Sequence, residues 1–132
     1  MIVVDTSALM AILNAEAGSA DCLSVIMRET DIVICSATFT EAKIVAVRRG
    51  LAESMTALLA RSISEIVSLT PGRAQFAAEA YARWGKGFHP AALNFGDCFA
   101  YALAKERDCP LLYVGNDFAG TDISAAIPRD QM

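Results

Sequence analysis

Short apolar runs along this chain alternate with longer segments in which apolar residues recur every three or four positions. Such runs are typical of buried strands, and the longer spacing is typical of helices with one buried face. The pattern predicts strands at residues 2–4, 31–36, 66–69 and 111–114, with a candidate short edge strand at 123–127. It predicts helices at residues 6–14, 19–29, 38–49, 51–62, 71–84 and 94–108.

Several helix ends carry local signals. Thr38 and Glu41 have the spacing of a capping box, which predicts that a helix begins at Thr38. Gly50 follows two arginines and is expected to stop that helix. Thr70 and Pro71 suit the N-cap and the first position of a later helix.

The order of elements defines the fold class. Strands that are apolar throughout and separated by helices indicate a parallel sheet with helices on both faces. We therefore predict an α/β protein with a central, mainly parallel sheet of four to five strands. The length of 132 residues fits one domain, so residues 1–132 are expected to form a single domain. The hydrophobic content of 55% excludes a disordered chain.

Charge narrows the choice of partners. The net charge is −4, whereas proteins that neutralise many phosphates are usually basic. Any nucleic-acid function must therefore explain where this negative charge is used. Charged residues make up only 20% of the chain, which indicates that some apolar surface contacts a partner.

The compartment is predicted from what the chain lacks. Residues 1–5 have no basic segment, Asp5 interrupts the first apolar run, and no apolar stretch approaches the roughly 18 residues of a membrane span. We expect no signal peptide, no membrane contact and a cytoplasmic protein. The cysteines form no C-x-x-C pair and are expected to be free thiols rather than zinc ligands, at Cys22, Cys35, Cys98 and Cys109.

Acidic residues follow the predicted strands. Asp5 ends the first strand, Glu41 and Asp97 lie in the first turns of two helices, and Asp117 follows the fourth strand. Functional crevices of parallel sheets lie beyond the carboxyl ends of the strands, so these four side chains are expected to gather there. Crowded carboxylates repel one another, and Mg²⁺ or Mn²⁺ removes the repulsion. Such ions also hold phosphodiesters and activate water.

Each acidic residue also has a purely structural interpretation. Glu41 can complete the capping box, Asp97 can favour a helix N-terminus, and Asp117 and Asp122 can be turn or cap residues. Asp5 is the hardest to explain in this way. A carboxylate directly after a buried strand needs a partner, and no nearby lysine supplies one.

Basic and aromatic residues near position 85 are candidate contacts for a nucleic acid. Arg73, Arg83 and Lys86 could contact phosphates, although ordinary solvated side chains would show the same pattern. Trp84 and Phe88 could stack on bases, although core or interface packing is the alternative interpretation.

Four segments resemble the PIN domains of VapC-type toxins. Residues 2–8 (IVVDTSA) resemble the opening of a PIN domain, and residues 93–104 (LNFGDCFAYALA) resemble the segment around the third acidic residue of VapC-type toxins. Residues 115–123 are similar to the closing motif, and residues 85–91 to a common loop. The resemblance implies a three-layer α/β/α fold and an Mg²⁺- or Mn²⁺-dependent endoribonuclease. It also implies a toxin silenced by a VapB-type antitoxin, and a homodimer.

The resemblance assigns roles to the acidic residues. Asp5 and Asp97 match the principal metal ligands, Glu41 matches the second acidic position, and Asp117 or its neighbour matches the fourth. Asn116 is a departure, because relatives often have an acid there. A neutral amide lowers the negative charge on the side of a second metal ion.

The same comparison assigns substrate-binding positions. Thr6 and Ser7 match positions where hydroxyls and backbone amides line the pocket. With Asn116, Arg83 and Lys86 they form the predicted substrate-binding set. The apolar helical region 38–62 could be covered by an antitoxin segment or a second subunit, with ordinary core packing as the alternative.

Other activities fit the residues less well. A phospho-receiver domain needs an aspartate at the end of the third strand, where Leu69 and Thr70 stand, and a dinucleotide-binding domain needs a glycine-rich turn after the first strand. A dehalogenase-type phosphatase needs an aspartate where Ser7 stands. The remaining alternative is a PIN-like scaffold that binds a partner without cutting RNA.

Overall fold

The computed structural model describes residues 1–128. The elements in chain order are β1 (Ile2–Val4), α1 (Thr6–Leu13), α2 (Ser19–Arg28), β2 (Ile32–Cys35), α3 (Ser36–Arg48), α4 (Ala52–Ser62), β3 (Glu65–Val67), α5 (Pro71–Trp84), α6 (Asp97–Arg107) and β4 (Leu111–Leu112). No helix within residues 1–128 is long and apolar enough to cross a membrane.

The strands form one parallel sheet in the order β3-β2-β1-β4. Val3 of β1 pairs with Val33 on one side and with Leu111 of β4 on the other. The predicted parallel sheet is therefore confirmed, with four strands among the described residues. The candidate strand at 123–127 makes only an isolated bridge, between Ala125 and Leu111, and extends the sheet no further.

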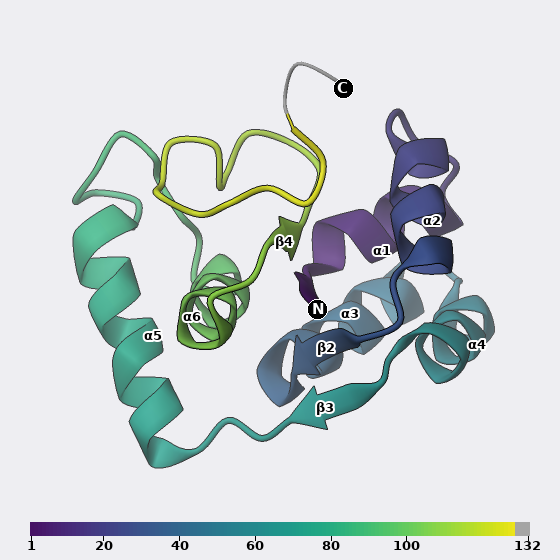
Figure 1. Ribbon diagram of the computed structural model, residues 1–132, viewed down its shortest axis with the longest axis horizontal. Helices are drawn as coiled ribbons and strands as arrows, with labels where there is room; N and C mark the ends of the chain where they lie inside the picture. The colour runs from purple at the N-terminus through teal and green to yellow at the C-terminus, as the bar shows by residue number, and fades with distance from the viewer. Residues whose placement is uncertain (129–132) are drawn as a thin grey trace.

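Helices cover both faces of the sheet, which makes the architecture a three-layer α/β/α sandwich. Figure 1 shows α5 and α6 on one side of the strands and α1 to α4 on the other. Ile2 and Val4 pack into the core under α1 to α4, whereas Val3 packs into the core under α5 and α6. Because strands buried on both faces are apolar at every position, the strand runs show no alternation.

The prediction that a capping box starts a helix at Thr38 is wrong. Helix α3 begins at Ser36, directly after β2, with Cys35 as its N-cap residue. Thr38 lies inside the helix, and its buried hydroxyl has no hydrogen-bond partner. The hydroxyl of Ser36 instead accepts a hydrogen bond from the backbone N–H of Leu69 at 2.9 Å, which ties the start of α3 to the segment after β3. Glu41 is thus free of any capping role.

Other boundaries shift by one to three residues. Helix α6 begins at Asp97 rather than at residue 94, β3 ends at Val67 and β4 ends at Leu112. Two end signals are confirmed. The hydroxyl of Thr70 accepts a hydrogen bond from the Arg73 N–H at 3.2 Å, and Gly50 adopts a φ of 72° just past α3.

Candidate functional site

Asp5 sits where β1 turns into α1 and acts as the N-cap residue of that helix. Its Oδ2 accepts a hydrogen bond from the Ser7 N–H at 3.0 Å. The side chain is almost fully buried, and its other oxygen, Oδ1, has no hydrogen-bond partner. Burial raises the pKa of Asp5 to about 7; the Ser7 hydrogen bonds oppose this shift, and the charges of Asp97 and Glu41 add to it.

Glu41 reaches the same place from α3. Its Oε1 accepts a hydrogen bond from the Thr6 hydroxyl at 2.6 Å, which fixes one end of the carboxylate at the start of α1. Its other oxygen lies so close to Gly96 that any side chain at position 96 would collide with it. Glycine at position 96 therefore lets the start of α6 approach the carboxylate of α3.

Asp97 opens α6 and is half-buried. Its Oδ2 accepts a hydrogen bond from the Asn94 N–H at 3.0 Å, in the segment before the helix, and its place in the first turn of α6 agrees with its structural interpretation. Burial raises the pKa of Asp97 to about 6; the Asn94 bond opposes this shift, and repulsion from Asp117 and Glu41 adds to it. A place in the first turn of a helix and a role in a site are compatible for this residue.

The structure thus brings the four predicted acidic residues into one electrostatic group. The charge of Asp97 acts on Asp5, and the charge of Asp117 acts on Asp97, while Glu41 acts on both Asp5 and Asp97. The charges that act on the two aspartates of raised pKa are those of other carboxylates. We call Asp5, Glu41, Asp97 and Asp117 the carboxylate cluster.

Hydroxyl groups at the start of α1 link this helix to two of the segments that carry the cluster. The Thr6 hydroxyl donates to Glu41, and the Ser7 hydroxyl accepts a hydrogen bond from the Val114 N–H at 3.1 Å. The second contact ties α1 to the chain after β4, which carries Asn116 and Asp117. Both of these residues are exposed, and Gly115 before them adopts a φ of 98°, which a glycine takes without strain.

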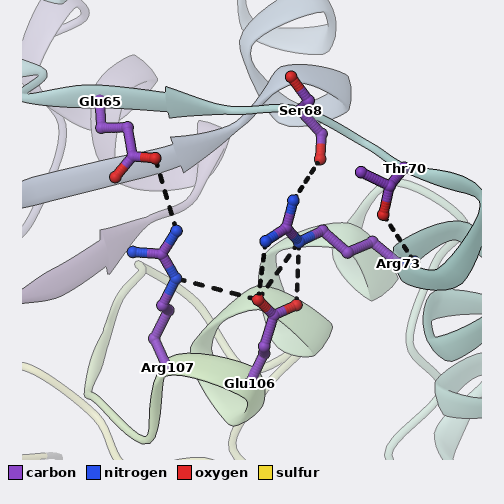
Figure 2. Close-up of polar contacts among 6 residues, drawn as sticks. All are labelled: Glu65, Ser68, Thr70, Arg73, Glu106 and Arg107. Carbon is purple, nitrogen blue, oxygen red and sulfur yellow. Dashed lines mark hydrogen bonds and ion pairs between the residues drawn. The ribbon is translucent and has the colours of Figure 1, made fainter.

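The basic residues behave differently from one another. Arg73 is held by Glu106 of α6, with an ion pair at 3.0 Å, and by the carbonyl oxygen of Ser68 (Figure 2). The Arg73 guanidinium lowers the pKa of Glu106 below its usual range. In the same view Arg107 reaches Glu65 of β3 at 3.5 Å, so the group joins α5, α6 and the edge strand. Arg73 is therefore a structural residue.

Arg83 and Lys86 are exposed at the end of α5 and in the loop after it. The Arg83 guanidinium lies over the ring of Trp84, 4.6 Å from the ring centroid. Trp84 is buried, and its indole N–H donates to the Tyr101 hydroxyl at 2.9 Å. The core interpretation of Trp84 is confirmed, whereas Phe88 is 67% exposed.

Tyr101 and Asp122 are important residues that sequence reasoning missed or underrated. The Tyr101 hydroxyl donates to Asp122 at 2.5 Å, and Lys105 forms an ion pair with the same carboxylate at 3.2 Å. Burial and this hydrogen bond raise the pKa of Tyr101 to about 12. Asp122 therefore joins the chain after β4 to α6 through these two contacts. Its partner is 21 positions away, so no local pattern signals the contact.

The donors of the cluster suit a hard divalent cation in part. The ligand atoms would all be carboxylate oxygens, which Mg²⁺ and Mn²⁺ prefer. One of them, Oδ1 of Asp5, is buried and has no hydrogen-bond partner. Within residues 1–128, however, no three His, Cys, Asp or Glu side chains stand close enough together to form a ready-made metal site. The carboxylate chemistry of these residues fits such an ion. To coordinate one ion jointly, their side chains would have to move closer to one another.

The cysteines take no part in the cluster. All four are free thiols, as predicted, and Cys22, Cys35 and Cys98 are buried. Burial raises the pKa of Cys22 and of Cys98 to about 11, so both stay protonated at neutral pH.

Comparison with known proteins agrees with the fold and the residues. The sequence matches the PIN domain family over residues 2–123. It is 36% identical to ribonuclease VapC28 of Mycobacterium tuberculosis, over 97% of this chain and 99% of that protein.

Two solved structures share the fold at lower identity. VapC20 of Mycobacterium tuberculosis, described as a Sarcin-Ricin loop cleaving toxin, superposes with a TM-score of 0.79 at 18% identity, over 97% of this chain and 100% of VapC20. A toxin–antitoxin complex from Klebsiella pneumoniae gives a TM-score of 0.70 at 16% identity, over 92% and 93% of the two chains. The match over residues 2–123 and the 36% identity to VapC28 show that this chain belongs to the PIN domain family, within its VapC group.

Proposed function

We propose that this chain is the toxin of a toxin–antitoxin pair and a metal-dependent endoribonuclease that hydrolyses RNA phosphodiester bonds at the carboxylate cluster. The observation that carries the proposal is the buried Asp5 at the carboxyl end of β1, with one oxygen lacking a hydrogen-bond partner and with the charges of Asp97 and Glu41 raising its pKa, while Asp117 acts in the same way on Asp97. The names of the relatives support the reaction, since VapC28 is a ribonuclease and VapC20 is described as cleaving the Sarcin-Ricin loop.

Asp5 and Asp97 would hold Mg²⁺ or Mn²⁺, with Glu41 and Asp117 beside them. A bound ion of this type lowers the pKa of a coordinated water and offsets negative charge on the phosphate. The chain contributes orientation. The Ser7 N–H holds one oxygen of Asp5, whose other oxygen has no hydrogen-bond partner, and the Asn94 N–H holds one oxygen of Asp97.

Glu41 is positioned from two sides. The Thr6 hydroxyl holds Oε1, and the missing side chain of Gly96 leaves room for Oε2. Asn116 stands beside Asp117 with a neutral amide, so this side of the cluster carries less negative charge than an Asp-Asp pair would. We infer that one ion held by Asp5 and Asp97 is the principal one.

The partners follow from the solved relatives. Because a structural neighbour is a toxin–antitoxin complex, we propose a VapB-type antitoxin as the partner of this chain, and a homodimer as its assembly. The apolar residues of region 38–62 divide into two groups. Met55 and Leu58 are core residues, whereas Ile44 and Val47 of α3 are 53% and 65% exposed and remain available to a partner.

The test uses protein purified away from any antitoxin. Wild-type chain is incubated with total RNA and Mg²⁺ or Mn²⁺, in parallel with an EDTA sample and with the Asp97→Asn variant. Asp21→Asn is the matched control, because Asp21 is an exposed aspartate in the first turn of α2. We expect cleavage by the wild type and Asp21→Asn alone.

The alternative function is a PIN-like scaffold that binds a partner without cutting. Folded, metal-supplied wild-type protein that leaves every RNA class intact would favour the scaffold. Cleavage that survives both EDTA and Asp97→Asn would instead place the reaction outside the carboxylate cluster.

A further inference from the structure

An apolar pocket opens between α5 and α6, the two helices that lie side by side on one face of the sheet (Figure 1). Its volume is about 290 Å³, just below the roughly 300–1,000 Å³ of small-molecule sites. None of its lining residues is charged. They are Leu69, Ala74, Ala77, Ala78, Tyr81, Phe95, Cys98 and Phe99. We call this cavity the α5–α6 pocket.

Phe95 connects this pocket to the carboxylate cluster. It stands two residues before Asp97, and its neighbour Asn94 donates the backbone hydrogen bond that orients the Asp97 carboxylate. The Phe95 ring is 76% exposed and meets the ring of Phe99 edge-on, with centroids 5.0 Å apart. Burial of such a ring is favourable, and this chain by itself leaves it exposed.

Tyr81 of α5 also lines the pocket and links it to the loop that carries Lys86. Its hydroxyl donates to the carbonyl oxygen of Lys86 at 3.3 Å, and its ring meets that of Phe88 edge-on at 5.9 Å. Phe88 and Lys86 are both exposed. Two aromatic pairs thus border the pocket: Phe95 and Phe99, of which Phe95 stands two residues before Asp97, and Tyr81 and Phe88, of which Phe88 lies in the loop that carries Lys86. Proteins that bind single-stranded nucleic acid combine aromatic platforms with basic groups in this way.

We propose that the α5–α6 pocket holds one nucleobase of a single-stranded RNA substrate, with Phe95 as the stacking platform, next to the phosphate at the carboxylate cluster. The inference rests on the proposed ribonuclease function and names a binding site for its substrate. Lys86, whose backbone carbonyl accepts the Tyr81 hydroxyl proton, would meet a neighbouring phosphate of the same strand on the Tyr81 side of the pocket.

The pocket selects for a stacked ring rather than for one base. Its side-chain polar groups are the Tyr81 hydroxyl and the Cys98 thiol, and both already donate their protons to backbone carbonyl oxygens, of Lys86 and Asn94. Neither proton is available to read the edge of a base. We therefore expect purines and pyrimidines to be accepted at this nucleotide, with affinity that follows stacking strength.

The first test compares cleavage kinetics on a short single-stranded RNA that the wild type cuts at one position. Phe95→Leu removes the ring and keeps an apolar side chain, and Phe95→Trp keeps a stacking surface. Phe76→Leu is the matched control, because Phe76 is an exposed residue of α5 outside the pocket lining. Since stacking is worth about 1–3 kcal/mol per base, Phe95→Leu should raise KM by roughly 5- to 150-fold with kcat nearly unchanged. Phe95→Trp should restore KM, and Phe76→Leu should leave it unchanged.

The second test removes the base instead of the ring. The same RNA is made with an abasic ribose on either side of the cut. One of these two substrates should raise the wild-type KM as much as Phe95→Leu does, and should raise the KM of Phe95→Leu no further. If each abasic substrate raised the KM of Phe95→Leu by the same factor as that of the wild type, Phe95 and the base would act independently. That result would overturn the inference.

Two further outcomes separate the inference from its foundation. An unchanged KM for Phe95→Leu, with a shifted ratio of monomer to dimer in sedimentation velocity, would make Phe95 a protein-interface residue and overturn the inference alone. A wild type that cuts no RNA would overturn the proposed function. In that case, anisotropy of a fluorescent single-stranded RNA still decides the inference. Weaker binding by Phe95→Leu supports it, and equal or absent binding refutes it.

Discussion

Replacing Asp5 by asparagine should stabilise the metal-free protein at neutral and alkaline pH. Asparagine keeps an oxygen to accept the Ser7 N–H, so the cap of α1 survives, and it removes the charge that burial disfavours. The sign follows from the raised pKa. Between pH 4 and pH 7 the folded protein keeps the Asp5 proton and the unfolded chain releases it, so wild-type stability falls as pH rises through this window.

The magnitude follows from the size of the shift. The pKa of Asp5 rises from 3.8 to about 7, and each pKa unit corresponds to about 1.4 kcal/mol. Above pH 8 the buried charge thus costs the folded state up to about 4 kcal/mol. Asparagine still buries a polar amide, so the expected gain is about 2–4 kcal/mol. For a chain of this size that gain raises Tm by about 6–12 °C.

The assay is denaturation in EDTA at pH 5 and pH 8, for wild type, Asp5→Asn and the exposed-residue control Asp21→Asn. The gain of Asp5→Asn over wild type should be largest at pH 8 and should shrink toward pH 5, while Asp21→Asn should follow the wild type. A gain of equal size at both pH values, or no gain at pH 8, would refute the claim that the charge of Asp5 strains the fold. Added Mn²⁺ should then stabilise the wild type and leave Asp5→Asn unchanged.

Three further predictions follow from single contacts. Gly96→Ala should lower both Tm and RNA cleavage, because the added methyl group would collide with the Glu41 carboxylate. In a double variant that also carries Glu41→Ala, Tm should recover but cleavage should not. Tyr101→Phe should cost about 1–3 kcal/mol in urea denaturation, because it removes the hydroxyl that donates to Asp122. Arg73→Met should shift the urea midpoint only slightly, since its ion pair is partly exposed, and should leave RNA cleavage at the wild-type rate.

The parallel sheet and the position of the carboxylate cluster were predictable from sequence for one physical reason. Runs buried on both faces lose their alternation, and the ends of parallel strands converge at one edge. Asp5 is therefore identifiable from the run before it. Asp97 and Asp117 needed the resemblance to VapC-type toxins as well, because each also has an ordinary cap or turn interpretation.

Contacts between distant segments were not predictable in this way. Glu41 has the spacing of a capping box with Thr38, but its real partner is Thr6, 35 positions away. The backbone enters α3 directly from β2, so the helix starts before any residue of the apparent box. From the sequence, Arg73 is a candidate phosphate-binding residue in a basic segment. Its ion pair with Glu106 forms only because α5 packs against α6. Local patterns carry no information on which of several polar residues a folded chain will pair.

The same geometry explains why the carboxylate cluster costs stability and is nevertheless held rigidly. Thr6, the Ser7 N–H and the Asn94 N–H each hold one oxygen of a carboxylate, and the buried second oxygen of Asp5 has no hydrogen-bond partner. A site built only for stability would pair that oxygen or bury an apolar group instead. Fixed carboxylates with free oxygens lose little further conformational freedom when a cation arrives, and their mutual repulsion is then converted into affinity for it. The strain at Asp5 is therefore the expected signature of a site completed by a ligand from outside the chain.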